Sequence, residues 1–264
     1  MVSGFIHKDL STPIVGVTMY KFFVQPEQVM AAKVEVLGPD VNHMKNVLRF
    51  PLGKEVLISD GDGHNYRCQL VGYEEQKVIL EIIETIESST ELPVYIHLYQ
   101  GLPKKDKMEL VIQKSVELGV AEVTPLIMKR SIVKLDEKSK VKKQVRWQGI
   151  ADSAAKQSKR CILPKVNMPH SIREVTEALK GYDLLLVPYE NAKGMHYTRS
   201  ILSDVKKCDK IGIIIGPEGG FDATEIEALK AIDAKIVSLG KRILRTETAG
   251  LALMSYLMID MEEA

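Results

Sequence analysis

The most constraining feature of the sequence is a regular alternation of apolar and amphipathic segments after Leu92. Short apolar runs predict strands, and the stretches between them have helical spacing. The expected strands are 94–100, 122–128, 183–188, 210–215 and 235–239. This alternation predicts an α/β domain with a mostly parallel sheet. We expect a helix from Pro103 to Leu118 that Gly119 ends, and a buried final helix from Thr246 to about Asp260.

Two glycine-bearing loops follow strands of this sheet. The first loop lies within the segment Ile211 to Asp222 and contains Gly216-Pro-Glu-Gly-Gly220. The second, Leu239 to Ala249, follows the next strand. Loops at the carboxyl ends of such strands usually bind ligands, so we expect one shared pocket. Neither loop has a nucleotide-phosphate signature of the Gly-x-x-x-x-Gly-Lys or Gly-x-Gly-x-x-Gly type. Tight turns without a ligand are the alternative.

Charged residues narrow the kind of ligand. Glu218, Asp222 and Glu225 surround the start of the helix after the first loop and would repel a pyrophosphate. A neutral or cationic ligand such as S-adenosylmethionine fits better. Asp222 and Glu225 also have the spacing of a helix N-cap with its capping box. Arg245 precedes a helix whose expected cap is Thr246, an unfavourable place for a cation, so it should face an anion or a carbonyl, or pair with a structural carboxylate.

The first third of the chain reads as a small β-barrel. Short strands are expected at 22–24, 55–59, 66–73 and 77–83, with a helical segment from Pro39 to Phe50 and a linker from Glu84 to Glu91. Further on, the segment from Lys129 to Arg160 holds eleven lysines and arginines against three acids. A polyanion could bind there, although a solvated helix face is the alternative.

Composition excludes several classes of protein. The three cysteines are far apart, and the six histidines lack ligand spacing, so we expect neither a metal nor a disulfide framework. No apolar run is long enough for a membrane span. A reduced cytoplasm is the expected location.

Several motifs, taken together and in order, resemble one family. They are His43-Met-Lys-Asn-Val-Leu-Arg49, Lys104 to Val120 with Glu117-Leu-Gly119, Arg130-Ser131, Ala154-Ala-Lys-Gln-Ser-Lys-Arg160, Gly216-Pro-Glu-Gly-Gly-Phe221 and Leu239-Gly240 with Ile243-Leu-Arg-Thr-Glu-Thr-Ala249. The chain from Met19 onward resembles the RsmE family of ribosomal small-subunit methyltransferases, of the SPOUT class. Lys156 and Lys159 stand where the family pattern has Glu and Gly, and residues 1–18 have no counterpart in it.

The resemblance implies a fold and an activity. It implies a PUA-like RNA-binding β-barrel over 19–90 and a SPOUT methyltransferase domain with a trefoil knot over 91–264, after an extension of residues 1–18. It also implies a homodimer that uses S-adenosylmethionine to methylate N3 of a uridine in the 16S rRNA of the 30S subunit. Two alternatives stay open: a SPOUT methyltransferase acting on tRNA or a 2′-hydroxyl, and an RNA-binding assembly factor without catalysis.

The resemblance also implies roles for single residues. The cofactor would be bound by Leu186, Val187, Pro188, Glu190, Ile215, Gly216, Pro217, Glu218, Gly219, Gly220, Leu239, Gly240, Ile243 and Leu244. We expect Arg245 to place positive charge near a uracil carbonyl, with Glu218, Glu247 or solvent as the general base. RNA contacts are expected from His43, Arg49, Arg130, Gln157 and Arg160. Packing or capping within the barrel is the alternative for His43.

Overall fold

A computed structural model describes residues 19–86, 90–190, 192 and 194–262 and divides the chain into two compact units. The first unit takes in the chain to Ile58 together with Asn65–Ile86, and the second takes in Ser59–His64 and everything from Glu87. The loop 59–64 belongs to the second unit because the Ser59 hydroxyl donates to the Cys161 carbonyl at 2.7 Å. The predicted extension, residues 1–18, lies outside the described residues.

The first unit is a curled five-stranded sheet around its own apolar core. Its strands are β1 (Lys21–Phe23), β2 (Lys33–Leu37), β3 (Glu55–Ser59), β4 (Asn65–Tyr73) and β5 (Lys77–Ile86), in the order β1-β3-β4-β5-β2. The sequence prediction missed β2, which pairs antiparallel with β5. It also began the linker too early, because β5 extends to Ile86.

The helical segment of the first unit is short and irregular. After a 3-10 turn at Pro26–Gln28, α1 spans only Pro39–Asn42, and the chain continues as a π-helix over His43–Val47. Arg49 then takes a left-handed conformation with φ of 49°, which ends the helix. The predicted helix to Phe50 therefore stops short, and π-helical turns of this kind are often found at functional sites.

The second unit contains a seven-stranded sheet in which each pairing among the described residues is parallel. The path is β12-β10-β11-β6-β7-β8, with β9 also paired to β7. Its strands are β6 (Tyr95–Gly101), β7 (Glu122–Ile127), β8 (Lys165–Val166), β9 (His170–Ser171), β10 (Leu184–Pro188), β11 (Lys210–Ile215) and β12 (Lys235–Val237). The predicted mostly parallel α/β fold is confirmed.

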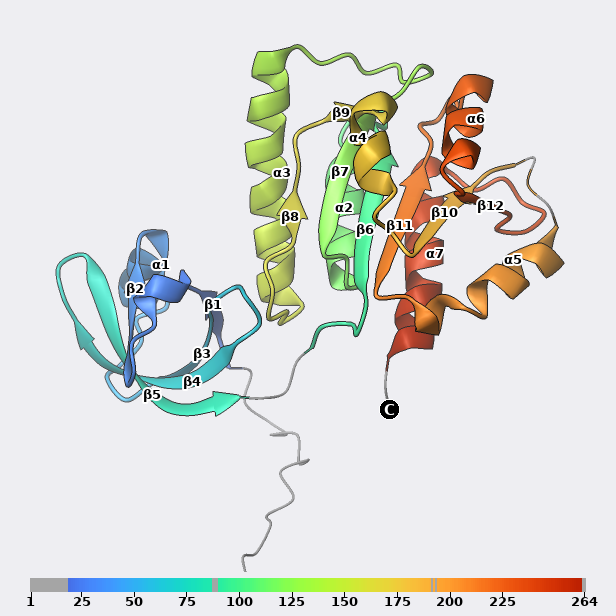
Figure 1. Ribbon diagram of the computed structural model, residues 1–264. Helices are drawn as coiled ribbons and strands as arrows, with labels where there is room; N and C mark the ends of the chain where they lie inside the picture. Colours follow the sequence, from blue (N-terminus) through green and yellow to red (C-terminus); the bar gives the residue numbers. More distant parts are fainter. Residues whose placement is uncertain (1–18, 87–89, 191, 193, 263–264) are drawn as a thin grey trace, which may run out of the picture. The chain divides into compact units, whose positions relative to one another are not determined.

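Helices cover both faces of this sheet (Figure 1). The helical elements are α2 (Lys107–Glu117), α3 (Glu137–Gln157), α4 (Ile172–Leu179), α5 (Met195–Leu202), a 3-10 turn at Val205–Lys207, α6 (Ala223–Ala231) and α7 (Thr246–Met261). Residues of α4 and α6 share a buried cluster with one face of β6, β10 and β11. On the other face α7 contacts β6, β11 and α2, and α3 packs against α2. The trefoil knot implied by the resemblance stays a prediction.

Helix α2 begins later than predicted. It starts at Lys107 rather than at Pro103, because Lys105 has a φ of 58° that a helix cannot accommodate. Its end agrees with the prediction: Gly119 has a φ of 90°, and its N–H donates to the Val116 carbonyl at 3.1 Å. The result places the first turn of α2 beside the loop that follows β11, as described below.

Close backbone contact at the end of β6 leaves no room for a side chain. A Cβ atom on Gly101 would lie 2.5 Å from the backbone nitrogen of Pro217 and 2.8 Å from the carbonyl carbon of Gly216. Both neighbours are backbone, so they cannot turn away as a flexible side chain could. Gly101 is therefore required for the loop after β11 to pass over the end of β6.

We expect Gly101→Ala to destabilise the protein by about 1–3 kcal/mol, the usual cost of overpacking. The matched control is Gly149→Ala in α3, where a Cβ atom would meet nothing within 4 Å. Alanine there should be neutral or stabilising, because glycine costs about 1 kcal/mol inside a helix. Urea denaturation of both variants provides the measurement. Equal midpoints for Gly101→Ala and the unmodified protein would contradict the packing argument.

Candidate active site

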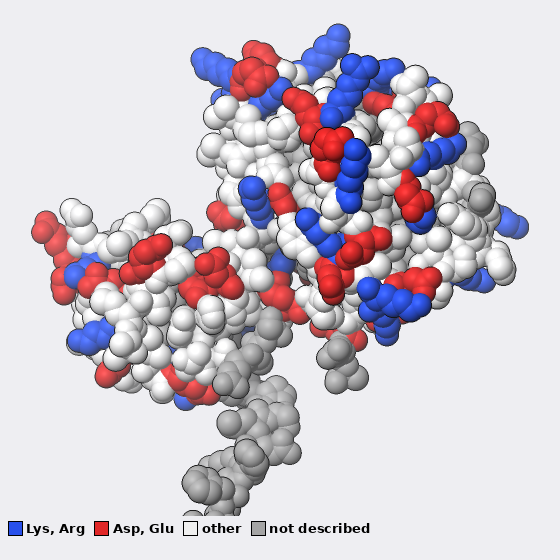
Figure 2. Space-filling view, in the orientation of Figure 1, with Lys and Arg blue, Asp and Glu red and all other residues white. Residues whose placement is uncertain are grey.

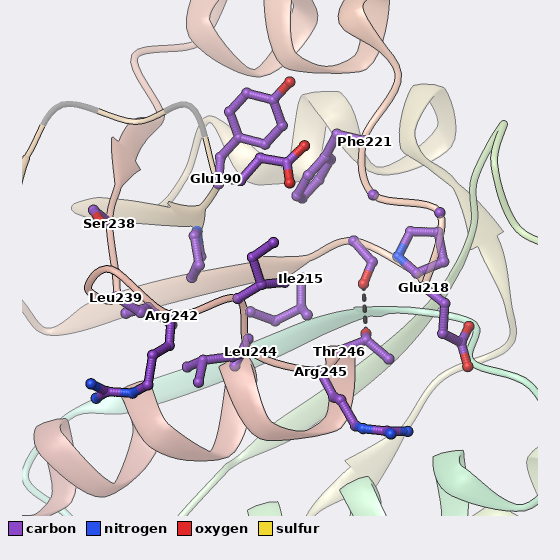
Figure 3. Close-up of a pocket in the computed structure, with 18 of the residues that line it drawn as sticks. Glu190, Ile215, Glu218, Phe221, Ser238, Leu239, Arg242, Leu244, Arg245 and Thr246 are labelled. Carbon is purple, nitrogen blue, oxygen red and sulfur yellow. Dashed lines mark hydrogen bonds between the residues drawn. The ribbon is translucent and has the colours of Figure 1, made fainter.

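Three loops at the carboxyl ends of neighbouring parallel strands enclose one cavity of about 460 Å³. They follow β10, β11 and β12, the last leading directly into α7 (Figure 3). The volume is within the usual range of small-molecule sites. The predicted cofactor-binding residues that line it are Pro188, Glu190, Ile215, Gly216, Pro217, Glu218, Gly219, Gly220, Leu239, Gly240, Ile243 and Leu244. The structure thus brings the two glycine loops into one pocket.

The walls of the cavity are largely apolar. Phe221 is buried, and its ring meets the ring of Tyr189 edge to face with centroids 6.1 Å apart. Ile215, Leu239 and Leu244 lie around the opposite side in Figure 3. The glycine loops also line the cavity, together with six charged residues: Lys107, Glu190, Glu218, Lys241, Arg242 and Arg245. A flat, uncharged ring system held by main-chain groups suits such walls.

The floor of the cavity depends on Thr246. This residue is the first of α7 rather than its cap, because Arg245 takes the extended N-cap conformation, which corrects the sequence prediction. The buried Thr246 hydroxyl donates to the Gly216 carbonyl at 2.6 Å, the dashed line of Figure 3, and accepts from the Gln100 side-chain amide at 2.8 Å. The side chain of Thr246 therefore ties the loop after β11 to α7 and to β6.

Two of the predicted acids face away from the cavity. Asp222 caps α6 and Glu225 completes the expected capping box, which is confirmed. Hydrogen bonds from the hydroxyl and backbone N–H of Thr224, together with Lys129, lower the pKa of Asp222 to about 2. Asp222 and Glu225 therefore serve the helix start, as the sequence predicts, and neither lines the cavity.

Glu218 and Glu247 are joined by one lysine from α2. The Lys107 ammonium lies 3.4 Å from Glu218 and 3.3 Å from Glu247, and the Lys104 backbone N–H donates to Glu218 at 3.0 Å. Burial acts to raise the pKa of Glu218, but these N–H donors and the Lys107 charge outweigh it, so that pKa is lowered. Glu218 is consequently ionised at neutral pH and is a weak base. Glu247 does not line the cavity.

Two predicted cofactor residues belong to the core instead. Leu186 and Val187 are fully buried within β10, and neither lines the cavity. The strand ends at Pro188, so the first residues able to face a ligand are Pro188 and those after it. The predicted roles of the Leu186 and Val187 side chains are corrected accordingly.

The predicted RNA contact of Arg160 is also corrected. Its side chain is only 5% exposed and forms an ion pair with Glu91, whose other oxygen accepts the backbone N–H of Cys161 at 2.7 Å. The guanidinium also donates to the carbonyls of Val116 and Val120. A buried arginine with these partners is structural and cannot reach an RNA phosphate. The Arg160 side chain therefore belongs to the interior of the second unit.

The other predicted RNA contacts are exposed within their own units. In the first unit, His43 lies edge-on to Phe22 and Arg49 follows the π-helix. In the second unit, Arg130 and Gln157 are exposed before and at the end of α3. These four side chains are therefore accessible to a ligand.

Sequence reasoning missed several residues of the cavity. Tyr189, Phe221 and Ser238 also line it, as do Lys107, Lys241, Arg242, Thr246 and Ala249. Tyr189 directly follows a predicted strand, Ser238 lies near the end of another, and Phe221 ends the first glycine loop, so these three could have been included on that ground. Lys107 lies in a helix more than a hundred residues before the loops that follow β11 and β12, and its position depends on how α2 packs beside α7.

The described residues contain neither a metal-binding cluster nor a helix that could span a membrane. Histidine, cysteine, aspartate and glutamate do not gather there into a group of three or more able to hold a metal ion. Within the same part of the chain, we find no helix with the length and apolarity that a bilayer crossing demands.

Comparison with known proteins identifies the family of the chain. Residues 90–258 match the family model of an RNA methyltransferase domain, and residues 36–83 match an RNA methyltransferase PUA domain. A protein of Bacillus subtilis named ribosomal RNA small subunit methyltransferase E is 35% identical over 92% of this chain and 98% of its own length.

Solved structures agree with this. A protein from Neisseria gonorrhoeae with the same name, bound to S-adenosyl methionine, is 33% identical with a TM-score of 0.77, over 90% of this chain and 96% of that one. A putative methyltransferase from Legionella pneumophila in complex with the same cofactor is 30% identical with a TM-score of 0.78, over 92% and 98%. The chain therefore belongs to the RNA methyltransferase family that includes the proteins named ribosomal RNA small subunit methyltransferase E.

Proposed function

We propose that this enzyme methylates N3 of a uridine in the 16S rRNA of the small ribosomal subunit, with S-adenosylmethionine as methyl donor. Its family is that of RNA methyltransferases, and relatives similar over nearly the whole chain are named for the small-subunit rRNA. The observation that carries the proposal is the convergence of three strand-end loops on one cavity. We infer that the enzyme works in the cytoplasm, where ribosomal subunits are assembled in bacteria.

The cavity suits S-adenosylmethionine. Backbone groups of Gly216, Gly219 and Gly240 would approach the ligand closely, while Phe221 and Leu244 would contact the adenine. Two relatives of similar fold hold this cofactor. When bound, it supplies a methyl group that carries positive charge through the adjacent sulfonium. Glu190, which lies beside Phe221 in Figure 3, is exposed and could balance that charge.

Methyl transfer to uracil N3 requires that N3 become a nucleophile. N3 carries a proton, and its loss leaves negative charge shared with the two neighbouring carbonyl oxygens. Arg245 lines the cavity, is exposed, and has no ion-pair partner among the described residues. We assign it to stabilise that charge. Glu218 is a poor choice of base because its pKa is lowered, and Glu247 is held by Lys107, so we assign the proton to solvent.

RNA docking is assigned to exposed residues of both units. His43 and Arg49 would contact RNA from the first unit, and Arg130 and Gln157 from the second. Arg160 is excluded because its guanidinium is buried against Glu91. The first unit matches a PUA domain of RNA methyltransferases, which supports its role in docking.

We further infer that the enzyme is a homodimer, as the family resemblance implies. Helices α2 and α7 pack against each other, and each keeps large apolar side chains exposed. Leu110 of α2 is 45% exposed, and Tyr256 and Ile259 of α7 are 43% and 72% exposed. A second copy of the chain would bury these side chains.

The substrate assignment predicts a specific loss. Nucleosides from 16S rRNA of a strain lacking this gene should contain no N3-methyluridine, and expression of the gene should restore it. Mass spectrometry of purified 16S rRNA measures this. Retention of N3-methyluridine, with loss of another methylated nucleoside, would reject the proposed target and favour a different RNA site.

The role of Arg245 predicts a separation of binding from turnover. Arg245→Ala should lower methyl transfer to 30S particles by about 10²–10³-fold, as for other removed donors to developing charge. Cofactor binding by calorimetry should stay within about threefold, because adjacent loops hold the ligand. The matched control is Arg173→Ala, an exposed arginine of α4 outside the cavity. Normal turnover by Arg245→Ala would end this assignment.

The dimer predicts an effect of charge on α7. Ile259→Asp should convert the protein to monomers in sedimentation velocity, because an aspartate buried in an apolar interface lacks a partner. Val145→Asp on α3, where the valine is 65% exposed, should leave the dimer intact. A monomeric unmodified protein, or a dimeric Ile259→Asp variant, would show that α7 is not the interface.

A further inference from the structure

The loop after β7 and the loop after β11 meet at one buried carboxylate. Glu225 is 7% exposed, and its two oxygens accept different backbone donors. One accepts the Lys129 N–H at 2.9 Å, and the other accepts the Asp222 N–H at 2.8 Å. A single side chain on α6 therefore holds the main chain of two loops that are more than ninety residues apart in sequence.

Side-chain and backbone contacts reinforce this junction. The Lys129 ammonium reaches Thr224 at 2.6 Å and Asp222 at 3.3 Å. A Cβ atom on Gly219 would lie 2.9 Å from both the Cβ atom and the carbonyl oxygen of Arg130. The backbones of the two loops are thus in contact, so a displacement of one loop displaces the other.

Each loop has a separate task in the proposed function. The loop Gly216–Phe221 lines the cofactor cavity. On the segment 129–134, Lys129, Arg130 and Lys134 are exposed. Figure 2 shows lysine and arginine side chains along the rim of the second unit above the start of α3, with acidic ones between them. Exposed cations on a loop are suited to RNA phosphates.

We propose that Glu225 is a positioning residue that couples RNA docking on the segment 129–134 to cofactor binding on the loop 216–221. This inference rests on the proposed function. A phosphate bound by Arg130 restricts its loop, and Glu225 passes that restriction to the backbone at Asp222. The second ligand then meets a loop that is already ordered, so it binds with a smaller entropy cost. Such coupling is reciprocal: each ligand strengthens the other by the same factor.

The test compares coupling in Glu225→Gln with that in the unmodified full-length protein. The glutamine keeps one acceptor oxygen but turns an NH₂ donor toward the other backbone N–H, so one loop is released. The cofactor product S-adenosylhomocysteine is the probe because it allows no turnover. Its affinity is measured by calorimetry with and without saturating 16S rRNA transcript, and RNA affinity is measured by filter binding with and without the probe.

We expect each ligand to strengthen the other at least about fivefold in the unmodified protein, the lower end of usual coupling. In Glu225→Gln the factor should fall to near one. Glu227→Gln is the matched control: this exposed residue lies on the same helix and pairs with Lys230 at 2.8 Å. It should keep the native factor. A merely structural Glu225 would lower the melting temperature and leave the factor unchanged, which would overturn the proposal.

A second variant covers the case in which Glu225→Gln does not fold. Lys129→Met removes only the exposed ammonium that reaches Asp222 and Thr224. Any direct loss of RNA affinity cancels in the coupling factor, which is a ratio of affinities measured with and without the other ligand. We therefore expect a partial fall in the coupling factor, and an unchanged coupling factor counts against the proposal. The proposed function fails separately, if the unmodified protein binds neither probe nor RNA. Binding of both without coupling rejects only the role of Glu225.

Discussion

The hydroxyl of Thr246 is the interaction on which the site depends. It donates to the carbonyl of Gly216 and accepts from the amide of Gln100, and all three groups are buried. These residues come from the loop after β11, the start of α7 and the end of β6. Buried hydrogen bonds of this kind are costly to leave unmade. The glycine at position 101 then lets the Gly216–Pro217 backbone lie directly on β6. Together they fix the cavity floor.

The fold was predictable where the local sequence pattern agrees with the burial that the tertiary structure imposes. Strand β11 appears at the predicted residues because each of its side chains after Lys210 is buried, as the apolar run requires. The capping box at Asp222 and Glu225 was equally readable, since its partners are three residues apart. The start of α2 was not readable from Pro103, because the turn before it depends on a left-handed Lys105 and on Glu218 from a distant loop.

The predictions of side-chain roles failed where the interaction partner of the side chain is distant in sequence. Arg160 was expected to contact RNA, yet its charge is matched by Glu91, about seventy residues earlier. Lys107 was missed for the same reason, because its two carboxylate partners lie more than a hundred residues later, Glu218 in the loop after β11 and Glu247 in the first turn of α7. The pocket backbone could be predicted because its glycines form local motifs. The pairing of charges around it could not, because it follows from how the helices pack.

That pairing of charges bears on how the reaction is accelerated. A general base works best when its pKa lies near the operating pH. Glu218 is shifted the other way, and Lys107 holds both it and Glu247. Among the described cavity residues, Arg245 and Arg242 project outward from the rim in Figure 3 with no carboxylate bound to them. Lys107 thus neutralises the two carboxylates, and the proposed mechanism assigns Arg245 to the substrate. In the proposed mechanism, acceleration comes from stabilising the uracil anion and aligning N3 with the methyl group rather than from a strong base.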